Sequence, residues 1–304
     1  LEKPGLPFAL VTGGKGGVGK SSIALNMAIE MGRRGQRVLL LCFTDGLGQW
    51  LASHLADDGI EARSISQLAV ELCQEQGIEM DPHNADRWEE ANLHASEVVQ
   101  DAATRWDVII VDEAQDLHQA NWLLVDALSG GGRLWAFHDP AQAFWAERAV
   151  PEEMFTSYFD LTTAYRSPPE LLRVAEALRT GSADVAAAVQ AAQDADCLRL
   201  VSCTSESSVA DKVVTAIENL RGEGLKPEEI AVISLRGFGT EGSVLQSDAL
   251  AKHDVVRADD AALVDHIVAD TFLRFKGLER PAVIVTDVHL VAGDDAGVRW
   301  FIAL

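Results

Sequence analysis

The feature that most constrains this chain is a glycine-rich segment near its start, Gly14-Lys15-Gly16-Gly17-Val18-Gly19-Lys20-Ser21. It lies between an apolar run at 8–12 and apolar residues at helical spacing from Ile23 to Met31, so it joins a buried strand to a helix. Glycines let backbone N–H groups turn inward around an anion, and the positive end of the following helix faces the same point. The segment therefore predicts a loop that binds the phosphates of a nucleotide.

Each residue type in this loop has an expected role. The ammonium of Lys20 neutralises the β- and γ-phosphates, and the hydroxyl of Ser21 holds a magnesium ion. The expected cofactors are therefore ATP and Mg²⁺. The residues that we expect to surround the nucleotide are those of the loop and the serine that follows it: Gly14, Lys15, Gly16, Gly17, Val18, Gly19, Lys20, Ser21 and Ser22.

Length and composition indicate a globular protein with two domains. The chain has 304 residues, of which 48% are hydrophobic and 24% charged. No apolar run approaches the roughly 20 residues that span a bilayer, and no signal pattern opens the chain, so we expect a cytoplasmic protein without a membrane partner. The cysteines show no paired metal spacing, so we expect buried thiols and no structural metal.

The net charge is strongly negative. With 25 Lys and Arg against 47 Asp and Glu, it is 25 − 47 = −22. Proteins contact nucleic-acid phosphates mainly through Lys and Arg, so this balance disfavours a nucleic-acid partner unless a basic groove forms locally.

Strand and helix patterns alternate along the whole chain, which predicts an α/β protein with mostly parallel sheets. A boundary near residue 160 divides it into domains 1–160 and 161–304. The expected strands are 8–12, 38–43, 108–112, 134–138, 198–202, 230–234, 267–271 and 282–287, and the expected helices include 84–105, 168–179 and 207–221. The stretch 183–195 is either a helix or a connector.

Two carboxylates follow the apolar run 108–111. Nucleotide sites in parallel sheets lie at the carboxyl edge of the strands, where Asp112 and Glu113 would emerge. We expect Asp112 to complete the magnesium site with Ser21, and Glu113 to act as the general base that activates water.

Several short motifs resemble those of superfamily 1 helicases, the UvrD/Rep-like group, and they follow in that family's order. They are Asp112-Glu113-Ala114-Gln115-Asp116, Phe137-His138-Asp139-Pro140-Ala141-Gln142, Ala164-Tyr165-Arg166-Ser167 and Phe275-Lys276-Gly277-Leu278-Glu279, together with the strand end at 38–44. The chain ends just before the last motif of that family, which carries a second arginine.

This resemblance implies two RecA-like P-loop NTPase domains and an ATP-dependent helicase or translocase that moves on single-stranded DNA. It implies that Gln142 senses the γ-phosphate, that Arg166 reaches it from the second domain, and that Glu279 contacts the nucleotide. A protein partner or a flanking nuclease domain is compatible with it. The residues that become nucleic-acid candidates are Thr44, Trp145, Arg274 and Lys276.

Two other interpretations stay open. The loop with its early Lys15 also resembles that of ParA/MinD partitioning ATPases, in which this lysine reaches across a dimer. That family normally has an Asp-containing segment at the next strand end, where this chain has Cys42-Phe43-Thr44 and a single Asp45. The negative charge also favours a regulatory ATPase that acts on a protein partner without DNA.

Overall fold

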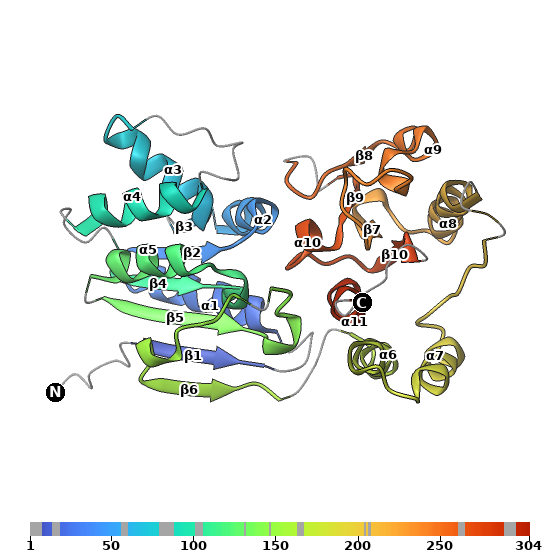
Figure 1. Cartoon of the computed structure of the whole chain (residues 1–304), viewed down its shortest axis with the longest axis horizontal. Helices are drawn as coiled ribbons and strands as arrows, with labels where there is room; N and C mark the ends of the chain where they lie inside the picture. The colour runs from blue at the N-terminus through green and yellow to red at the C-terminus, as the bar shows by residue number, and fades with distance from the viewer. Residues whose placement is uncertain are drawn as a thin grey trace. The chain divides into compact units, whose positions relative to one another are not determined.

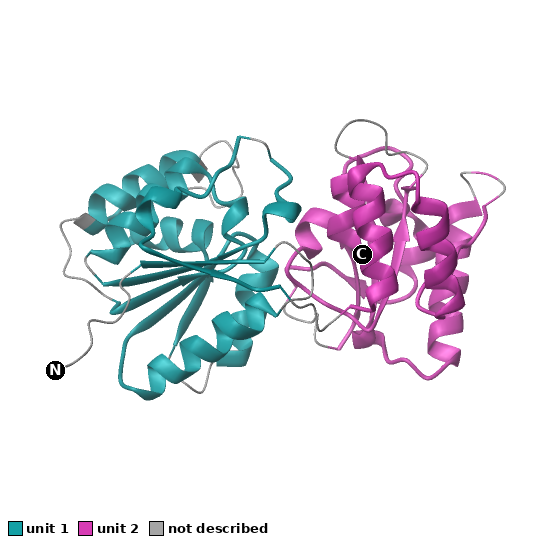
Figure 2. Cartoon of the chain, turned by 90° about the horizontal axis from the view of Figure 1, so that it is seen from below, with its two compact units in different colours: residues 1–166 teal, residues 167–304 magenta. Residues whose placement is uncertain are grey.

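The computed structural model describes most of the chain as two compact units, residues 1–166 and 167–304 (Figure 2). The described residues are 8–13, 19–55, 60–78, 88–100, 106–130, 132–145, 147–162, 167–203, 205, 208–260, 265–288 and 296–304, with the backbone alone at 88 and 100.

Unit 1 contains a six-stranded sheet in the order β3-β2-β4-β5-β1-β6, in which every neighbouring pair is parallel. Because β5 lies between β1 and β4, the strand that leads into the glycine-rich loop is separated by one strand from the strand that ends at Asp112. The strands are β1 (Phe8–Thr12), β2 (Val38–Cys42), β3 (Glu61–Ser64), β4 (Val108–Val111), β5 (Arg133–His138) and β6 (Ser157–Asp160).

Helices cover both faces of this sheet (Figure 1). On one face α1 (Lys20–Arg33) and α2 (Asp45–Leu55) pack on Leu40, Ile110 and Phe137. On the other, α3 (Ile65–Glu75), α4 (Trp88–Gln100) and α5 (Gln119–Ser129) pack on the alternate strand residues, such as Ile109 and Leu134. Strands buried on both faces read as continuous apolar runs, which is why the sequence marks β2 and β4 so clearly. Short 3₁₀ turns follow at Ala114–Asp116 (η2), Pro140–Gln142 (η3) and Glu152–Met154 (η4).

Unit 2 contains a four-stranded parallel sheet in the order β10-β7-β9-β8. Its core includes Ile217 of α8, Val232 of β7 and Ile267 of β9. The elements are α6 (Pro169–Thr180), α7 (Val185–Asp194), α8 (Val209–Gly222), η6 (Pro227–Glu229), β7 (Ile230–Ser234), η7 (Val244–Gln246), α9 (Asp248–Ala251), β8 (Val255–Val256), β9 (Ile267–Thr271), α10 (Phe272–Phe275), β10 (Ala282–Thr286) and α11 (Ala296–Ala303).

The predicted α/β class with mostly parallel sheets is confirmed, and seven of the eight expected strands are present within one or two residues. The strand expected at 198–202 is wrong: the segment has no regular secondary structure, and Leu200 and Val201 are 63% and 58% exposed, because no strand pairs with it among the described residues. The stretch 183–195 is helical as α7. The identification of the halves 1–160 and 161–304 as RecA-like domains stays a prediction.

Within the described ranges, no helix is long and apolar enough to cross a bilayer. All four cysteines are free thiols: Cys42 and Cys73 are buried, Cys197 is half-buried and Cys203 is exposed. The expectation of buried thiols therefore holds for two of the four.

One glycine sets how closely α2 approaches β3. A Cβ atom added at Gly48 would lie 2.7 Å from the backbone N of Ser64 and 3.0 Å from the carbonyl carbon of Arg63. We predict that Gly48→Ala lowers the free energy of unfolding by about 1–3 kcal/mol, because backbone atoms cannot move aside cheaply. Urea denaturation measures the change.

Gly222→Ala is the matched control. Gly222 ends α8, and a Cβ there meets nothing within 4 Å, so this variant should keep or slightly raise stability. Equal midpoints for the two variants would contradict the close approach of α2.

Candidate functional site

The site is organised around the start of α1, which follows β1 at the carboxyl edge of the unit 1 sheet. Gly19, just before the helix, has φ 82° and ψ 22°, a left-handed conformation that glycine adopts without steric cost. The helix is 14 residues long, so its N-terminus carries unpaired N–H groups and a partial positive charge suited to an anion. The rest of the predicted loop, Gly14 to Val18, lies outside the described residues.

Lys20, the first residue of α1, is buried, with 7% of its surface exposed. Its ammonium donates hydrogen bonds to the carbonyl oxygen of Gly13 at 3.1 Å and to Oδ2 of Asp139 at 2.9 Å. Asp139 follows the last residue of β5 and is fully buried. Burial raises the pKa of Asp139, and the neighbouring charge of Lys20 opposes that shift. A buried ammonium requires such a counterion, because an unpaired charge in a low dielectric is very unfavourable.

Asp112, which follows β4, is the second buried carboxylate of this edge. It is 0% exposed, and neither of its carboxylate oxygens has a well-formed hydrogen bond to any described residue. Burial and the adjacent charge of Glu113 raise the pKa of Asp112 to about 7, while the nearby Ser21 hydroxyl and Lys20 lower it. An ionisable side chain buried without partners is costly unless a cation arrives.

These residues fit a magnesium ion. Mg²⁺ is usually held by one or two protein carboxylates or hydroxyls together with substrate phosphates and water. Asp112 and Ser21 supply that donor set, and the described part of the chain contains no cluster of three or more His, Cys, Asp or Glu that would form a protein-only cage.

Glu113, the predicted general base, has a strained backbone. Its φ of 53° and ψ of 40° lie in the left-handed region, which costs a non-glycine residue about 1 kcal/mol or more. Its carboxylate accepts a hydrogen bond from the side-chain amide of Gln115 at 2.5 Å. The carbonyl oxygen of that amide in turn accepts the backbone N–H of Asp139 at 2.9 Å. Gln115 thus connects the end of β4 to the end of β5.

An aromatic cluster lies beside this network. The Arg148 guanidinium lies over the rings of Trp145 and Phe43, at 3.5 Å and 4.7 Å from their centroids, and donates to the Asp116 carbonyl at 2.6 Å. Burial lowers the pKa of Arg148 to about 10, so the side chain stays protonated at neutral pH. Arg148 covers one face of the Trp145 ring, the residue predicted to stack on bases.

The other predicted residues of unit 1 lie at the same edge. Gln142 ends η3 and is partly exposed, and Thr44 follows β2, with its hydroxyl accepting the Leu47 N–H at 3.4 Å. The structure therefore brings together Lys20, Ser21, Asp112 and Glu113, and places Gln142 after the intervening strand. The roles of these residues stay predictions.

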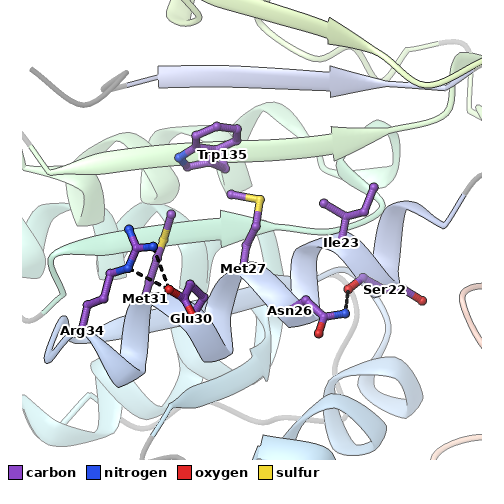
Figure 3. Close-up of a pocket in the computed structure, with 8 residues that line it drawn as sticks. All are labelled: Ser22, Ile23, Asn26, Met27, Glu30, Met31, Arg34 and Trp135. Atoms are coloured by element: carbon purple, nitrogen blue, oxygen red, sulfur yellow. Dashed lines mark hydrogen bonds and ion pairs between the residues drawn. The ribbon is translucent and has the colours of Figure 1, made fainter. Parts of the chain in front are cut away.

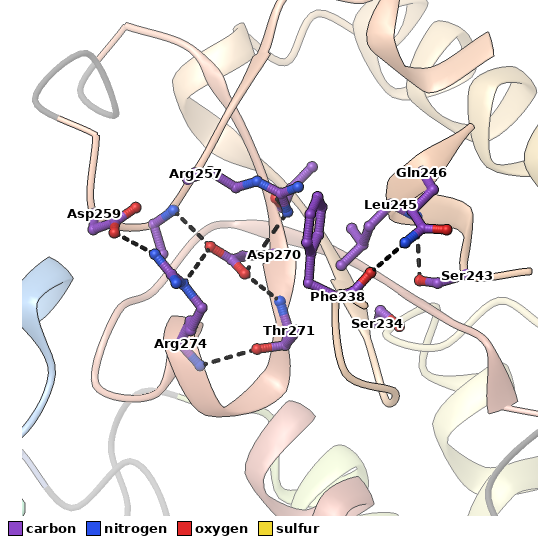
Figure 4. A network of polar contacts seen from close by, with 12 residues as sticks. Ser234, Phe238, Ser243, Leu245, Gln246, Arg257, Asp259, Asp270, Thr271 and Arg274 are labelled. Atoms are coloured by element: carbon purple, nitrogen blue, oxygen red, sulfur yellow. Dashed lines mark hydrogen bonds and ion pairs between the residues drawn. The ribbon is translucent and has the colours of Figure 1, made fainter. Parts of the chain in front are cut away.

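The predicted residues Arg274, Lys276 and Glu279 belong to unit 2, and Arg166 lies outside the described residues. Arg274 pairs with the buried Asp270, Nε to Oδ2 at 3.2 Å, and also with Asp259 (Figure 4). Lys276 is buried and Glu279 is exposed. Arg274 thus contributes to an internal ion-pair network, so a nucleic-acid contact by its guanidinium would compete with these carboxylates.

A cavity of about 500 Å³ lies along α1, lined mainly by apolar side chains such as Met27, Met31 and Trp135 (Figure 3). Among the described residues, its lining includes Ser22 but not Gly19, Lys20, Ser21, Asp112 or Glu113. Within the part of the chain that the structure describes, this cavity and the proposed nucleotide site therefore have different lining residues.

Sequence reasoning missed Asp139, Gln115 and Arg148 as site residues. Asp139 carries a usable signal, because it directly follows a buried strand, as Asp112 does. The Lys20–Asp139 pair joins residues 119 positions apart, and no short pattern predicts such a contact. Arg148 has no signal in the sequence.

A buried lysine at the start of the helix that follows the first strand, next to a buried strand-end aspartate without a well-formed hydrogen bond to a described residue, defines a P-loop nucleotide-binding protein. The chain belongs to the CobQ/CobB/MinD/ParA nucleotide-binding domain family, whose model matches residues 9–204. A comparison with curated proteins finds no match.

Similar solved structures include two of Pif1 helicases and one of DnaA. The first is of two coordinating Pif1 helicases that unwind forked double-stranded DNA (15% identity, TM-score 0.37, 76% of this chain and 51% of that one). The second is Pif1 from Candida albicans (14%, 0.40, 75% and 48%), and the third is AMPPCP-bound DnaA from Aquifex aeolicus (14%, 0.30, 59% and 47%). The chain spans about half the length of each of these proteins.

The family match corrects the resemblance to superfamily 1 (UvrD/Rep-like) helicases, which was wrong. The matched family includes MinD and ParA, whose loop the sequence of Gly14 to Ser21 also resembles. The physical reason for the error lies in the fold: short polar motifs follow buried strands in any parallel α/β nucleotide site, since that edge faces the ligand. Their order along the chain therefore reports the fold and not the class of enzyme.

The raised pKa of Asp112 predicts how the free energy of unfolding changes with pH. The folded protein retains a proton on Asp112 up to about pH 7, whereas the unfolded chain loses it near the ordinary value of 3.8. The free energy of unfolding of the nucleotide-free protein therefore falls as pH rises from 4 to 7. We predict that Asp112→Asn, which cannot ionise, raises stability at pH 8 by an amount on the order of a few kcal/mol, and much less at pH 4.

Urea denaturation at the two pH values in EDTA, without nucleotide, measures this difference. If Asp112→Asn gained as much stability at pH 4 as at pH 8, ionisation of the Asp112 carboxylate would not be the cause of the difference in stability.

Proposed function

We propose that this chain is a magnesium-dependent ATPase whose nucleotide state acts as a switch, in the manner of the ParA/MinD-like members of its family. The observation that carries the proposal is Asp112: it is buried at the sheet edge beside Ser21 and Lys20, and neither of its carboxylate oxygens has a well-formed hydrogen bond to a described residue. A Mg²⁺–triphosphate would satisfy all three groups together, because the ion takes the carboxylate and hydroxyl and the phosphates take the ammonium.

Each residue of the site has a separate role in the proposed reaction. Lys20 and the N–H groups at the start of α1 would hold the phosphates, and Ser21 and Asp112 would hold a magnesium ion, which would supply positive charge to balance the charge that develops on the phosphates. Glu113 accepts the proton of the attacking water. Gln142, which ends η3 at the same sheet edge, would sense the γ-phosphate.

We predict that Lys20→Ala abolishes tight ATP binding, because it removes the cation that holds the phosphates. Binding is measured by titration of a fluorescent ATP analogue with Mg²⁺. Lys212→Ala is the matched control, since Lys212 is an exposed lysine of α8. Equal nucleotide affinity in the two variants would rule out the phosphate-binding role.

We also predict that Glu113→Gln retains ATP binding and slows hydrolysis by more than about tenfold, because only the base is removed. Phosphate release at saturating ATP measures the rate. Glu30→Gln on the exposed side of α1 is the control. A rate for Glu113→Gln equal to that of the control would assign the base elsewhere.

The switch itself is tested by assembly. If Lys15 reaches across a dimer, ATP with Mg²⁺ should promote dimerisation of Glu113→Gln, which holds ATP unhydrolysed, and a further Lys15→Ala change should abolish it. Analytical ultracentrifugation measures the mass. A monomer under all conditions would reject the dimeric switch while leaving ATP hydrolysis untouched, and would favour a regulatory ATPase that acts on a different protein.

A second candidate is an ATPase stimulated by single-stranded DNA. It is favoured by the cluster of Phe43, Trp145 and Arg148, because Arg148 also binds the Asp116 carbonyl at the end of η2, close in sequence to Glu113. A nucleobase that stacked on these rings in place of the Arg148 guanidinium would break the bond from Arg148 to Asp116, and this would alter the turn next to Glu113. The net charge of −22 opposes it. Hydrolysis unchanged by saturating oligonucleotide at low salt would reject this candidate.

A further inference from the structure

The strongest unassigned feature of unit 1 is a continuous buried chain of polar contacts from Lys20 to Glu113. It runs from the Lys20 ammonium to Asp139 at 2.9 Å, from the Asp139 N–H to Gln115 at 2.9 Å, and from the Gln115 amide to Glu113 at 2.5 Å. All four residues are at most 8% exposed. Nothing in the proposed roles of Lys20 and Glu113 requires Asp139 or Gln115.

Asp139 is an anion in direct contact with the Lys20 ammonium, and a phosphate bound there would be a second anion on the same group. The Lys20 ammonium has three N–H donors, and the Gly13 carbonyl and Asp139 take two of them. A phosphate oxygen that binds the same ammonium meets a carboxylate of the same sign in a buried site, and two like charges there repel each other. Phosphate binding must therefore weaken the Lys20–Asp139 pair.

Gln115 can transmit that exchange, because its orientation is fixed at both ends. Its amide oxygen must face the Asp139 N–H, which is a donor, so its NH₂ group must face the Glu113 carboxylate, which is an acceptor. A shift of Asp139 at the end of β5 moves Gln115, and with it the carboxylate of the predicted base.

We propose that Asp139 is a placeholder for the nucleotide phosphates: it holds Lys20 when the site contains no nucleotide, competes with phosphate for that lysine, and couples the exchange to Glu113 through Gln115, a positioning residue. The proposal deepens the proposed function and rests on it. It predicts different effects for the two residues, tighter ATP binding when Asp139 is changed and a lower kcat when Gln115 is changed, which a purely structural role would not produce.

Asp139→Asn tests the placeholder. The asparagine keeps an oxygen for the Ala141 N–H, which Asp139 Oδ1 accepts at 3.0 Å. Its NH₂ group replaces Oδ2, so the variant loses both the negative charge and the acceptor for Lys20. We expect this variant to bind Mg²⁺–ATP at least roughly threefold more tightly than the parent, while its nucleotide-free form melts at a lower temperature. If Asp139→Asn does not fold, Asp139→Ser keeps a short acceptor and carries the same expectation. Unchanged or weaker ATP affinity would overturn the placeholder role.

Gln115→Leu tests the coupling. Leucine has a similar size but neither hydrogen-bonding group, so we expect kcat to fall by about fivefold or more while the dissociation constant of ATP changes by less than about twofold. If the leucine variant does not fold, Gln115→Glu is the second variant. It keeps an oxygen to accept the Asp139 N–H, has an oxygen in place of the NH₂ group that donates to Glu113, and carries the same expectation. An unchanged kcat would overturn the coupling.

Asp107→Asn is the matched control for both variants. Asp107 immediately precedes β4, at the opposite end of that strand from Asp112, and its carboxylate binds the Arg37 guanidinium at 2.8 Å. Breaking this pair should leave ATP affinity and kcat within about twofold of the parent. A parent chain that neither binds nor hydrolyses ATP would reject the proposed function. A parent that hydrolyses ATP, with Asp139 and Gln115 variants that behave like Asp107→Asn, would reject the placeholder alone.

Discussion

The buried ammonium of Lys20 is the charge on which the rest of this site depends. A lysine that is 7% exposed needs an anion beside it, and Asp139 supplies one. The strand order places that anion, because β5 lies between β1, which leads to the lysine, and β4, which leads to Asp112. The phosphate-binding group, its counterion and the predicted magnesium ligand thus follow from the topology of one sheet.

Negative charge exceeds positive charge at this edge. The carboxylates of Asp112, Glu113 and Asp139 are all buried. Burial and the charge of Glu113 raise the pKa values of Asp112 and Asp139, and the charge of Lys20 lowers them. The backbone of Glu113 adds strain to this electrostatic cost. A divalent cation together with a polyphosphate would neutralise these charges and complete their hydrogen bonds. The same charges and strain that favour ligand binding therefore lower the free energy of unfolding of the protein without ligand.

The parts predictable from sequence were those with strong local signals. Runs such as Val108 to Val111 predict buried strands because both faces of a parallel sheet are covered. The glycine-rich residue pattern likewise predicts a phosphate-binding loop between the first strand and the first helix. The polar strand β3 and the edge strand β6 were missed, since neither has a continuous apolar run. The Lys20–Asp139 pair could not be predicted, because it depends on strand order, and the short motifs that favoured the wrong family reflect only which sheet edge faces the ligand.

The intervening position of β5 has a consequence for how this protein can change. Side chains of β5 alternate between the two cores, with Phe137 buried on the α1 face and Ala136 on the opposite face. A slip of β5 by one residue would exchange these faces and also remove Asp139 from its lysine. Insertions and deletions in this strand should therefore be tolerated less well than in the edge strand β6, so β5 is the segment in which fold and chemistry are hardest to alter independently.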